Sequence, residues 1–340
     1  MKKKKLLWQL PFLAFLIIGT VLIVHGQQSV PYQHDEGKVF GTTYHITYQS
    51  NENLQKEIEQ ELKVVDMEFS MFNPQSTVSL INQGKKPILN ESFLEVYAMA
   101  EQVYKESGGA FDITVAPLVN AWGFGFKTQQ MPNTHQVDSL RELVGMNKVR
   151  IVGAKGRQTV QLSHPNMMLD FSAIAKGYGT DRVARMLIAH GISNFMVEIG
   201  GEVYAKGTNE KHLPWRIGVS KPVDDPEDTN QELETVLNVT DQAMATSGNY
   251  RNFYYKGGRK YAHTIDPKSG RPVQHSLLSA TVLAPTCTEA DAYATSFMVL
   301  GIEKAQKVLE QRKELKAYFI YQNAQGGLSV WRSKGLKEGK

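Results

Sequence analysis

The stretch TCTEADAYATSFMVLG, from Thr286 to Gly301, has polar residues at its beginning and the pattern of an apolar helix after them. It lies between two runs that are typical of strands, LLSATVLA before it and AYFIYQN after it. If the helix begins near Thr288, Asp291 and Thr295 lie on one face, four residues apart. The stretch therefore predicts a helix between two strands, with a carboxylate and hydroxyls at its start.

The rest of the chain mixes helices and strands. Helical spacing predicts one helix over 54–69, a second over 91–107 and a third that follows Asp170 and ends at His190. Strand-like runs are KVFGTTYHITYQ, NFMVEIGGEVYA, WRIGVS and TVLNVT. Because the two kinds of element do not alternate in strict βαβ order, we expect an α+β fold with mixed or antiparallel sheets and packed helices.

The N-terminus predicts export. Lys2 to Lys5 precede an apolar run from Leu6 to Val24 that is long enough to span a bilayer. No small-x-small cleavage site follows the run, so an uncleaved anchor is slightly favoured over a cleaved signal peptide. No Cys follows it either, which excludes a lipid-modified N-terminus. We expect the body to be held at the bacterial inner membrane and to face the periplasm or the outside.

The chain divides into four segments on these grounds: a signal peptide or anchor over 1–26, a polar tether over 27–38, a single body over 39–325 and a polar tail over 326–340. The net charge is +4, and without the four N-terminal lysines 34 basic residues balance 34 acidic ones. This balance gives no sign of a nucleic-acid partner. The single Cys287 excludes an intramolecular disulfide.

The polar start of the Thr286–Gly301 stretch has two interpretations. Carboxylate, hydroxyl and backbone carbonyl oxygens suit a hard cation such as Mg²⁺, and no His or Cys is spaced there for zinc or copper. Alternatively, Thr288 is the N-cap of the helix and Asp291 interacts with the helix dipole. The stretch alone favours the cap.

Three further motifs could bind a ligand or do chemistry. In LDFSAIAKGYG, small residues and Lys176 suit a phosphate or an electron-rich ring, although a solvated lysine on a helix is a good alternative. The aromatic and glycine-rich GGAFDITVAPLVNAWGFG suits a planar ligand or simple packing. His263, near Asp266 in HTIDPKSGRPV, is either a general base or a structural histidine in a turn.

The order of these motifs along the chain resembles the ApbE family of FAD:protein FMN transferases. The resemblance extends over about 39–321, through the motifs FGTTYHI, GAFDITVAPLVNAWGFG, LDFSAIAKGYGTDRVA, EIGGEVYAKG, ATSGNYRNF with HTIDPKSGRPV, and CTEADAYATSFMVLG. It implies an ApbE-type α+β fold that uses FAD as a substrate and Mg²⁺ as a cofactor. Phe40, where the family often has Met or Leu, and Glu202, where Asn or Asp is frequent, depart from the family pattern.

The resemblance also implies the site residues. The metal ligands would be Asp291 and Thr295 through their side chains, together with Thr288 and with Ala173 through its carbonyl. FAD would be bound by the turn at Phe40, Gly41 and Thr42 and by Phe72, Ala110, Phe111, Asp112, Asp170, Lys176, His263 and Ile265.

The expected reaction is Mg²⁺-dependent transfer of FMN from FAD to a Thr or Ser hydroxyl of an acceptor protein, with release of AMP. His263 or a nearby acid would take the hydroxyl proton, and Asp291 would be essential through the metal. The family suggests flavoprotein subunits of membrane redox complexes as acceptors. Two alternatives remain: a Mg²⁺-dependent FAD pyrophosphatase, and a protein that stores FAD without consuming it.

Overall fold

The computed structural model describes residues 11–18, 30–126, 131–224, 232–250, 252–336 and 338–339. Residues 11–18 form a helix whose apolar side chains are exposed. The rest of the predicted anchor lies outside the described residues. Within the described ranges, no helix is both long enough and apolar enough to cross a membrane.

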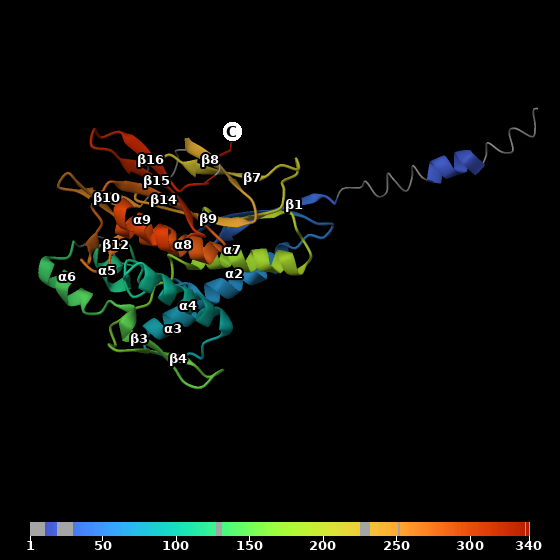
Figure 1. Cartoon of the computed structure of the whole chain (residues 1–340). Helices are drawn as coiled ribbons and strands as arrows, with labels where there is room; N and C mark the ends of the chain where they lie inside the picture. The colour runs from blue at the N-terminus through green and yellow to red at the C-terminus, as the bar shows by residue number, and fades with distance from the viewer. Residues whose placement is uncertain are drawn as a thin grey trace, which may run out of the picture.

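An antiparallel sheet of eight strands forms the upper layer of the body in Figure 1. Its order is β1–β2–β5–β6–β9–β14–β15–β16, and every neighbouring pair is antiparallel. The strands are β1 (Tyr32–Val39), β2 (Thr42–Gln49), β5 (Phe195–Ile199), β6 (Glu202–Lys206), β9 (Gln242–Gly248), β14 (Leu277–Ala284), β15 (Lys316–Gln322) and β16 (Leu328–Arg332).

The helices lie mainly on one side of this sheet (Figure 1). They are α2 (Gln55–Phe69), α3 (Thr77–Asn82), α4 (Glu91–Glu106), α5 (Ala116–Ala121), α6 (Thr134–Arg141), the 3₁₀ helix Met146–Lys148, α7 (Ala175–Ala189), α8 (Cys287–Leu300) and α9 (Ile302–Gln311). Four two-stranded ribbons complete the fold: β3 (Val149–Val152) with β4 (Thr159–Leu162), β7 (Trp215–Ser220) with β8 (Leu233–Val239), β10 (Phe253–Lys256) with β11 (Arg259–Ala262), and β12 (Ile265–Asp266) with β13 (Arg271–Pro272).

The largest cluster of buried side chains joins the sheet to the helices. Val282 of β14 and Phe319 of β15 belong to it together with Phe297 of α8 and Phe93 of α4. Helix α8 is buried on almost every side because it contacts β9 and β14 as well as α7 and α4. A buried helix of this kind must be apolar around most of its circumference, so its few polar residues need partners inside the protein.

Two hairpin turns meet at one end of the sheet. The turn between β1 and β2 places Phe40 at φ 52° and Gly41 at φ 75°, and the turn between β5 and β6 places Gly200 at φ 60°. A Cβ atom on Gly200 would lie 2.7 Å from Thr42 Cγ2. Glycine is therefore required at position 200 both for its backbone conformation and for the close approach of the first turn.

Most of the predicted helices and strands are confirmed, but the segments expected as a polar tether and a polar tail both contain a strand of the sheet. The expected tether over 27–38 contains most of β1, which pairs with β2 along its whole length. The expected tail over 326–340 contains β16, which pairs with β15. Both are edge strands with many polar residues, and their position at the sheet edges leaves these side chains partly in solvent.

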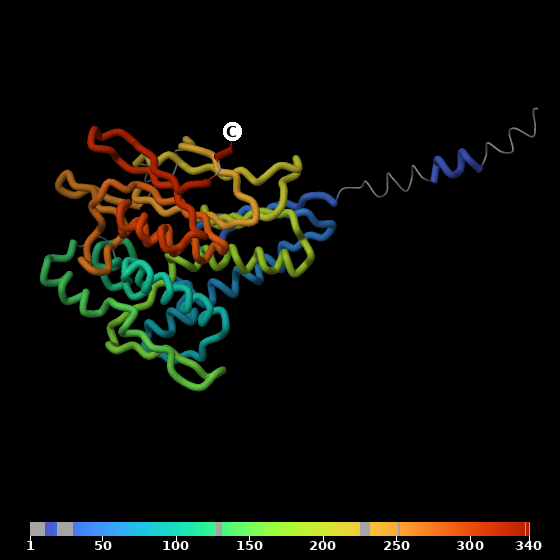
Figure 2. The backbone as a smooth tube through the Cα atoms, in the orientation of Figure 1, coloured from blue at the N-terminus to red at the C-terminus, as the bar shows by residue number. Residues whose placement is uncertain are grey.

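The chain also brings together segments that are far apart in sequence. Figure 2 shows the segment near residue 270 beside the segment near residue 120, and Trp122 Nε1 donates a hydrogen bond of 2.8 Å to the Gly270 carbonyl.

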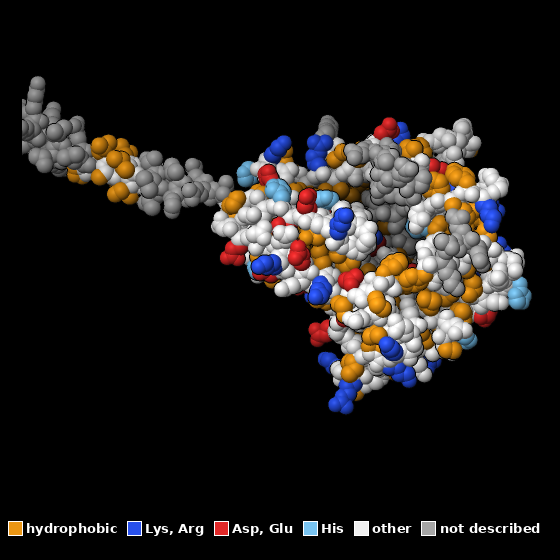
Figure 3. Space-filling view, turned by 180° about the vertical axis from the view of Figure 1, so that it is seen from behind, with side chains coloured by type: hydrophobic (Ala, Val, Ile, Leu, Met, Phe, Trp, Pro, Cys, Tyr) orange, Lys and Arg blue, Asp and Glu red, His pale blue; other side chains and the backbone are white. Residues whose placement is uncertain are grey.

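On the face in Figure 3, Lys and Arg side chains are interspersed with Asp and Glu side chains.

Candidate functional site

A cavity of about 470 Å³ lies where the sheet layer meets the helical layer. Its wall includes residues of the loop over 110–115, the start of α7, the β5–β6 turn, β9, the segment 263–267 and α8. Its volume is within the range of small-molecule sites. With Met71 and Phe72, which follow α2, seven distant parts of the described sequence line one concave site.

The charged end of this cavity is built around the start of α7. Lys176 Nζ donates to Glu202 Oε1 at 2.9 Å, and the Gly177 N–H donates to Asp291 Oδ2 at 3.0 Å. Glu202 and Asp291 are only 3% and 2% exposed. Two adjacent residues of α7 therefore hold two buried carboxylates, one from β6 and one from α8.

The electrostatics of this cluster leave one negative charge to be offset. Burial by itself would lower the pKa of Lys176, but Asp291 and Glu202 outweigh it and raise that pKa, so the ammonium is retained. Burial raises the pKa of both carboxyl groups, against the opposing effect of Lys176. Because two carboxylates share one ammonium, a proton or a further cation is needed to neutralise the cluster.

Hydroxyl groups extend this set of oxygen atoms along α8. Thr295, one turn after Asp291, lies with its Oγ1 3.1 Å from Ser247 Oγ of β9, and both line the cavity. Ala173 also lines the cavity. In the described part of the chain, no three His, Cys, Asp or Glu side chains come together as a metal site. A cation here would thus need hydroxyl and carbonyl oxygens as well as carboxylates.

These residues fit a hard cation. Glu202 Oε2 is buried and has no hydrogen-bond partner among the described residues, and carboxylate and hydroxyl oxygens are the donors that Mg²⁺ prefers. Asp291, Thr295 and Ala173, which the resemblance implies as ligands, all line this cavity.

The Thr288 side chain is placed neither as a metal ligand in the cavity nor as the helix cap. Helix α8 begins at Cys287, and its N-cap is Thr286, whose hydroxyl accepts from the Glu289 N–H, so the predicted cap at Thr288 is wrong. The Thr288 hydroxyl instead donates to Asp181 Oδ2 at 2.5 Å, and its side chain is not part of the cavity wall.

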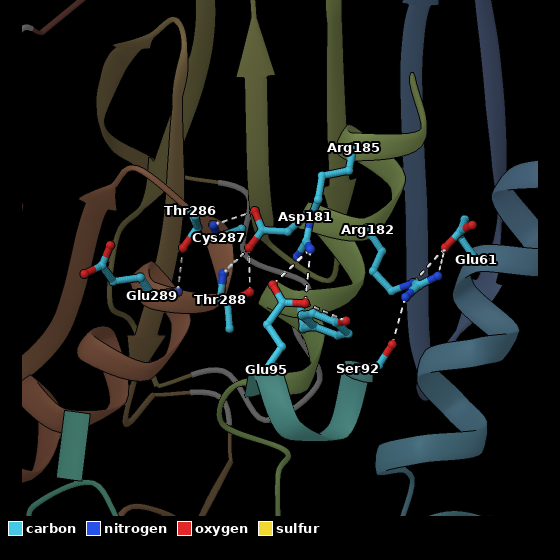
Figure 4. A network of polar contacts seen from close by, with 11 residues as sticks. Glu61, Ser92, Glu95, Asp181, Arg182, Arg185, Thr286, Cys287, Thr288 and Glu289 are labelled. Atoms are coloured by element: carbon cyan, nitrogen blue, oxygen red, sulfur yellow. Dashed lines mark hydrogen bonds and ion pairs between the residues drawn. The ribbon is translucent and has the colours of Figure 1, made fainter. Parts of the chain in front are cut away.

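Asp181 on α7 is a residue that the sequence analysis missed. Its carboxylate also accepts from the backbone N–H groups of Cys287 and Thr288 at 2.7 and 2.8 Å (Figure 4). It therefore fixes the first turn of α8 and, through it, the position of Asp291. The sequence did contain a sign of this placement, because Asp181 follows Gly177 by four residues and the two therefore lie on the same face of α7.

His263 lines the cavity in a form suited to accept a proton. Its Nδ1 lies 3.2 Å from the Asn252 carbonyl, which can only accept, so Nδ1 carries the hydrogen and Nε2 has a free lone pair. Burial lowers the pKa of His263, the bond to Asn252 opposes this, and the Lys176 charge lowers it further. The ring is therefore neutral at neutral pH.

The residues expected to bind FAD fall into two groups. Those in the cavity wall are Phe72, Ala110, Phe111, Asp112, Asp170, Lys176, His263 and Ile265. Phe40, Gly41 and Thr42 are not in the wall; Phe40 packs beside Gly179 of α7, and Thr42 beside Gly200. The β1–β2 turn thus supports the β5–β6 turn, which does line the cavity.

A larger hollow of about 860 Å³ lies beside α5 and α6. Its described lining includes Asn120, Phe126, His135 and Gln136 but no carboxylate, Lys or Arg. We assign no chemistry to it, since the buried charged groups Lys176, Glu202 and Asp291, whose pKa values are raised, all line the smaller cavity.

Comparison with known proteins places this geometry in a family. The model of the ApbE family matches residues 40–319. The chain is 39% identical over 303 residues to a Haemophilus influenzae protein called FAD:protein FMN transferase, covering 85% of this chain and 86% of that protein. It is 33% identical to the Escherichia coli protein of the same name, covering 89% and 87%.

Solved structures agree with this match. A flavin transferase ApbE from Vibrio cholerae has a TM-score of 0.79 at 34% identity and covers 89% of this chain and 97% of that one. A Pseudomonas stutzeri flavinyl transferase ApbE, in its apo form, has a TM-score of 0.80 at 30% identity, with 91% and 96% covered. With the family model, the relatives and the fold in agreement, the chain belongs to the ApbE family.

Proposed function

We propose that this protein is an FAD:protein FMN transferase that moves FMN from FAD to a Thr or Ser hydroxyl of an acceptor protein, with Mg²⁺ as cofactor. The observation that supports this most is the arrangement in one cavity of a buried ammonium, two buried carboxylates, paired hydroxyls and a neutral imidazole. A site for flavin storage would have no need of so many buried charged groups.

In the proposed reaction, the acceptor hydroxyl oxygen forms a bond to the phosphorus of the FMN half of FAD. The bond between this phosphorus and the oxygen bridging to AMP breaks, so the products are a protein–FMN phosphoester and AMP. Mg²⁺, when bound by Asp291, Thr295 and backbone carbonyl oxygen, supplies positive charge that stabilises the phosphates as negative charge develops. Thr288 would contribute only through its backbone, because its side chain is bonded to Asp181 and does not line the cavity.

The protein's own residues have separate roles. Lys176 keeps its charge and can bind a phosphate oxygen. His263 takes the hydroxyl proton at Nε2 while the Asn252 carbonyl holds the ring in the correct tautomer. Phe72, Phe111 and Ile265 provide apolar surface for the flavin or adenine ring.

Mass spectrometry of a Thr-containing acceptor peptide tests the proposal. The peptide is incubated with the full chain, FAD and Mg²⁺. We expect a mass gain corresponding to FMN that is lost with EDTA and in Asp291→Ala. If FAD is converted to free FMN and AMP while every acceptor peptide and flavoprotein subunit in the assay stays unmodified, the protein is instead a pyrophosphatase. FAD that stays intact would identify a storage protein.

The proposed location is the outer side of the bacterial inner membrane, with flavoprotein subunits of membrane redox complexes as acceptors. The proposal rests on the lysines and apolar run of the N-terminal sequence. Protease added to intact spheroplasts should digest the body while a cytoplasmic marker survives. A body that survives with the marker would contradict export.

A further inference from the structure

Glu202 has one carboxylate oxygen that no other described residue uses. It is the first residue of β6, directly after the Gly200–Gly201 turn, and it lines the cavity. Oε1 accepts from Lys176, whereas Oε2 is buried without a hydrogen-bond partner. A buried carboxylate oxygen of this kind is unfavourable unless a ligand or a proton satisfies it.

This free oxygen belongs to the same cluster as Asp291. Glu202 is bonded to the side chain of Lys176, and Asp291 to the backbone N–H of the next residue, Gly177. Each carboxyl group also raises the pKa of Lys176, as nearby negative charges do. The two carboxylates are therefore neighbours at one end of the cavity.

The charge of the cavity wall makes a second acidic ligand useful. Lys176 is the only Lys or Arg among the described residues that line the cavity, whereas its wall contains Asp112, Asp170, Glu202 and Asp291. The pyrophosphate of FAD is itself negatively charged. A strongly bound divalent cation would let this acidic wall accept an anionic substrate.

We propose that Glu202 is a direct ligand of the divalent cation and supplies, beside Asp291, a second carboxylate oxygen through Oε2. The inference rests on the cation site of the proposed function. The simpler alternative is that Glu202 is only the counter-ion of Lys176.

Europium luminescence separates these roles. Eu³⁺ is an oxygen-seeking probe of such sites, and its lifetimes in H₂O and D₂O count the water molecules bound to it. With the full chain, we expect Glu202→Gln to weaken Eu³⁺ binding by at least about tenfold and to add about one bound water. The amide oxygen can still accept from Lys176, so a pure counter-ion role predicts an unchanged count.

Two further variants complete the test. Glu202→Asp keeps the charge but shortens the side chain, so we expect a higher water count from it as well. Asp241→Asn is the matched control. Asp241 pairs at 3.6 Å with Lys206, which belongs to β6 as Glu202 does, but Asp241 does not line the cavity. It should leave affinity and water count unchanged.

The outcomes distinguish this inference from the proposed function. If Asp291→Asn reduces binding while Glu202→Gln leaves the water count unchanged, ligation by Glu202 is overturned, even if affinity falls through loss of charge. If the wild-type chain does not bind Eu³⁺, or Asp291→Asn binds it equally well, the cation site itself is wrong.

Discussion

If His263 is the general base, as we propose, its protonation state should limit the rate of transfer. Burial lowers its pKa below 6.5, so the neutral, proton-accepting form should persist as pH falls through 6.5. We expect the single-turnover rate to decline only below that pH. His263→Ala should lower the rate by about 10²–10⁴-fold and should abolish the decline of the rate at low pH.

His275 offers a matched control. Its Nε2 is also bonded to a backbone carbonyl, that of Met298, and burial also lowers its pKa, but it is not part of the cavity wall. His275→Ala should keep the rate and the pH profile. A His263→Ala enzyme that transfers FMN at the normal rate near neutral pH would remove the general-base role.

For single residues, sequence spacing predicts some contacts of the site and not others. Asp291 and Thr295 are four apart on one helix, so their common face follows from helical periodicity alone. The bond from Thr288 to Asp181 joins two helices, and the ion pair of Lys176 with Glu202 joins a helix to a strand. These depend on tertiary packing, which a local pattern does not encode.

Among the secondary-structure elements, the close contact of α7 with α8 positions the charged cluster. A Cβ atom on Gly177 would lie 2.3 Å from the Cys287 carbonyl oxygen and 2.8 Å from Asp291 Cβ. We expect Gly177→Ala to push the helices apart, to destabilise the fold by about 1–3 kcal/mol and to weaken metal-dependent transfer. Urea unfolding and transfer assays measure both effects.

Gly179→Ala on the same helix is the control. The atoms nearest to its Cβ would be those of the Phe40 ring, at 3.0 Å, and Ile199 Cδ1, at 3.7 Å, and a side chain can move where a backbone carbonyl cannot. It should cost less stability than Gly177→Ala. Equal losses in the two variants would mean that helix packing at Gly177 has no special role.

Asp181 holds the same pair of helices together through hydrogen bonds. Its carboxylate accepts three of them from Cys287 and Thr288 at the start of α8, in a buried position (Figure 4). Asp181→Asn replaces one acceptor oxygen by a donor, so we expect a loss of about 1–3 kcal/mol in stability. Metal affinity should fall as well, because the first turn of α8 carries Asp291 into the cluster.

An exposed acid tests whether this loss is specific. Asp138 of α6 forms only a surface ion pair with Arg141, and Asp138→Asn should change stability by less than about 1 kcal/mol. If Asp181→Asn unfolds at the same urea concentration as the wild type, the anchoring role of Asp181 is wrong.

For the whole molecule, the α+β class could be predicted because long helices and buried strands have strong periodic patterns. The edges of the sheet could not, since β1 and β16 contain many polar residues and are strands through their pairing with β2 and β15. The cavity could not be predicted from spacing either, because its described wall combines segments from seven parts of the chain. Only the resemblance to a family predicted that these segments form one site.

Because the cavity wall includes residues of both layers, its ligand should stabilise the whole body. A ligand present at about 100 times its dissociation constant adds about 2.7 kcal/mol to the free energy of unfolding. We expect FAD with Mg²⁺ to produce this shift in urea unfolding, and EDTA to remove much of it. Asp291→Asn should respond to FAD equally with and without Mg²⁺, because its cation site has lost a carboxylate. If wild-type protein gains the same stability from FAD in EDTA, the cation does not help to hold FAD, and the cluster around Lys176 binds the substrate without it.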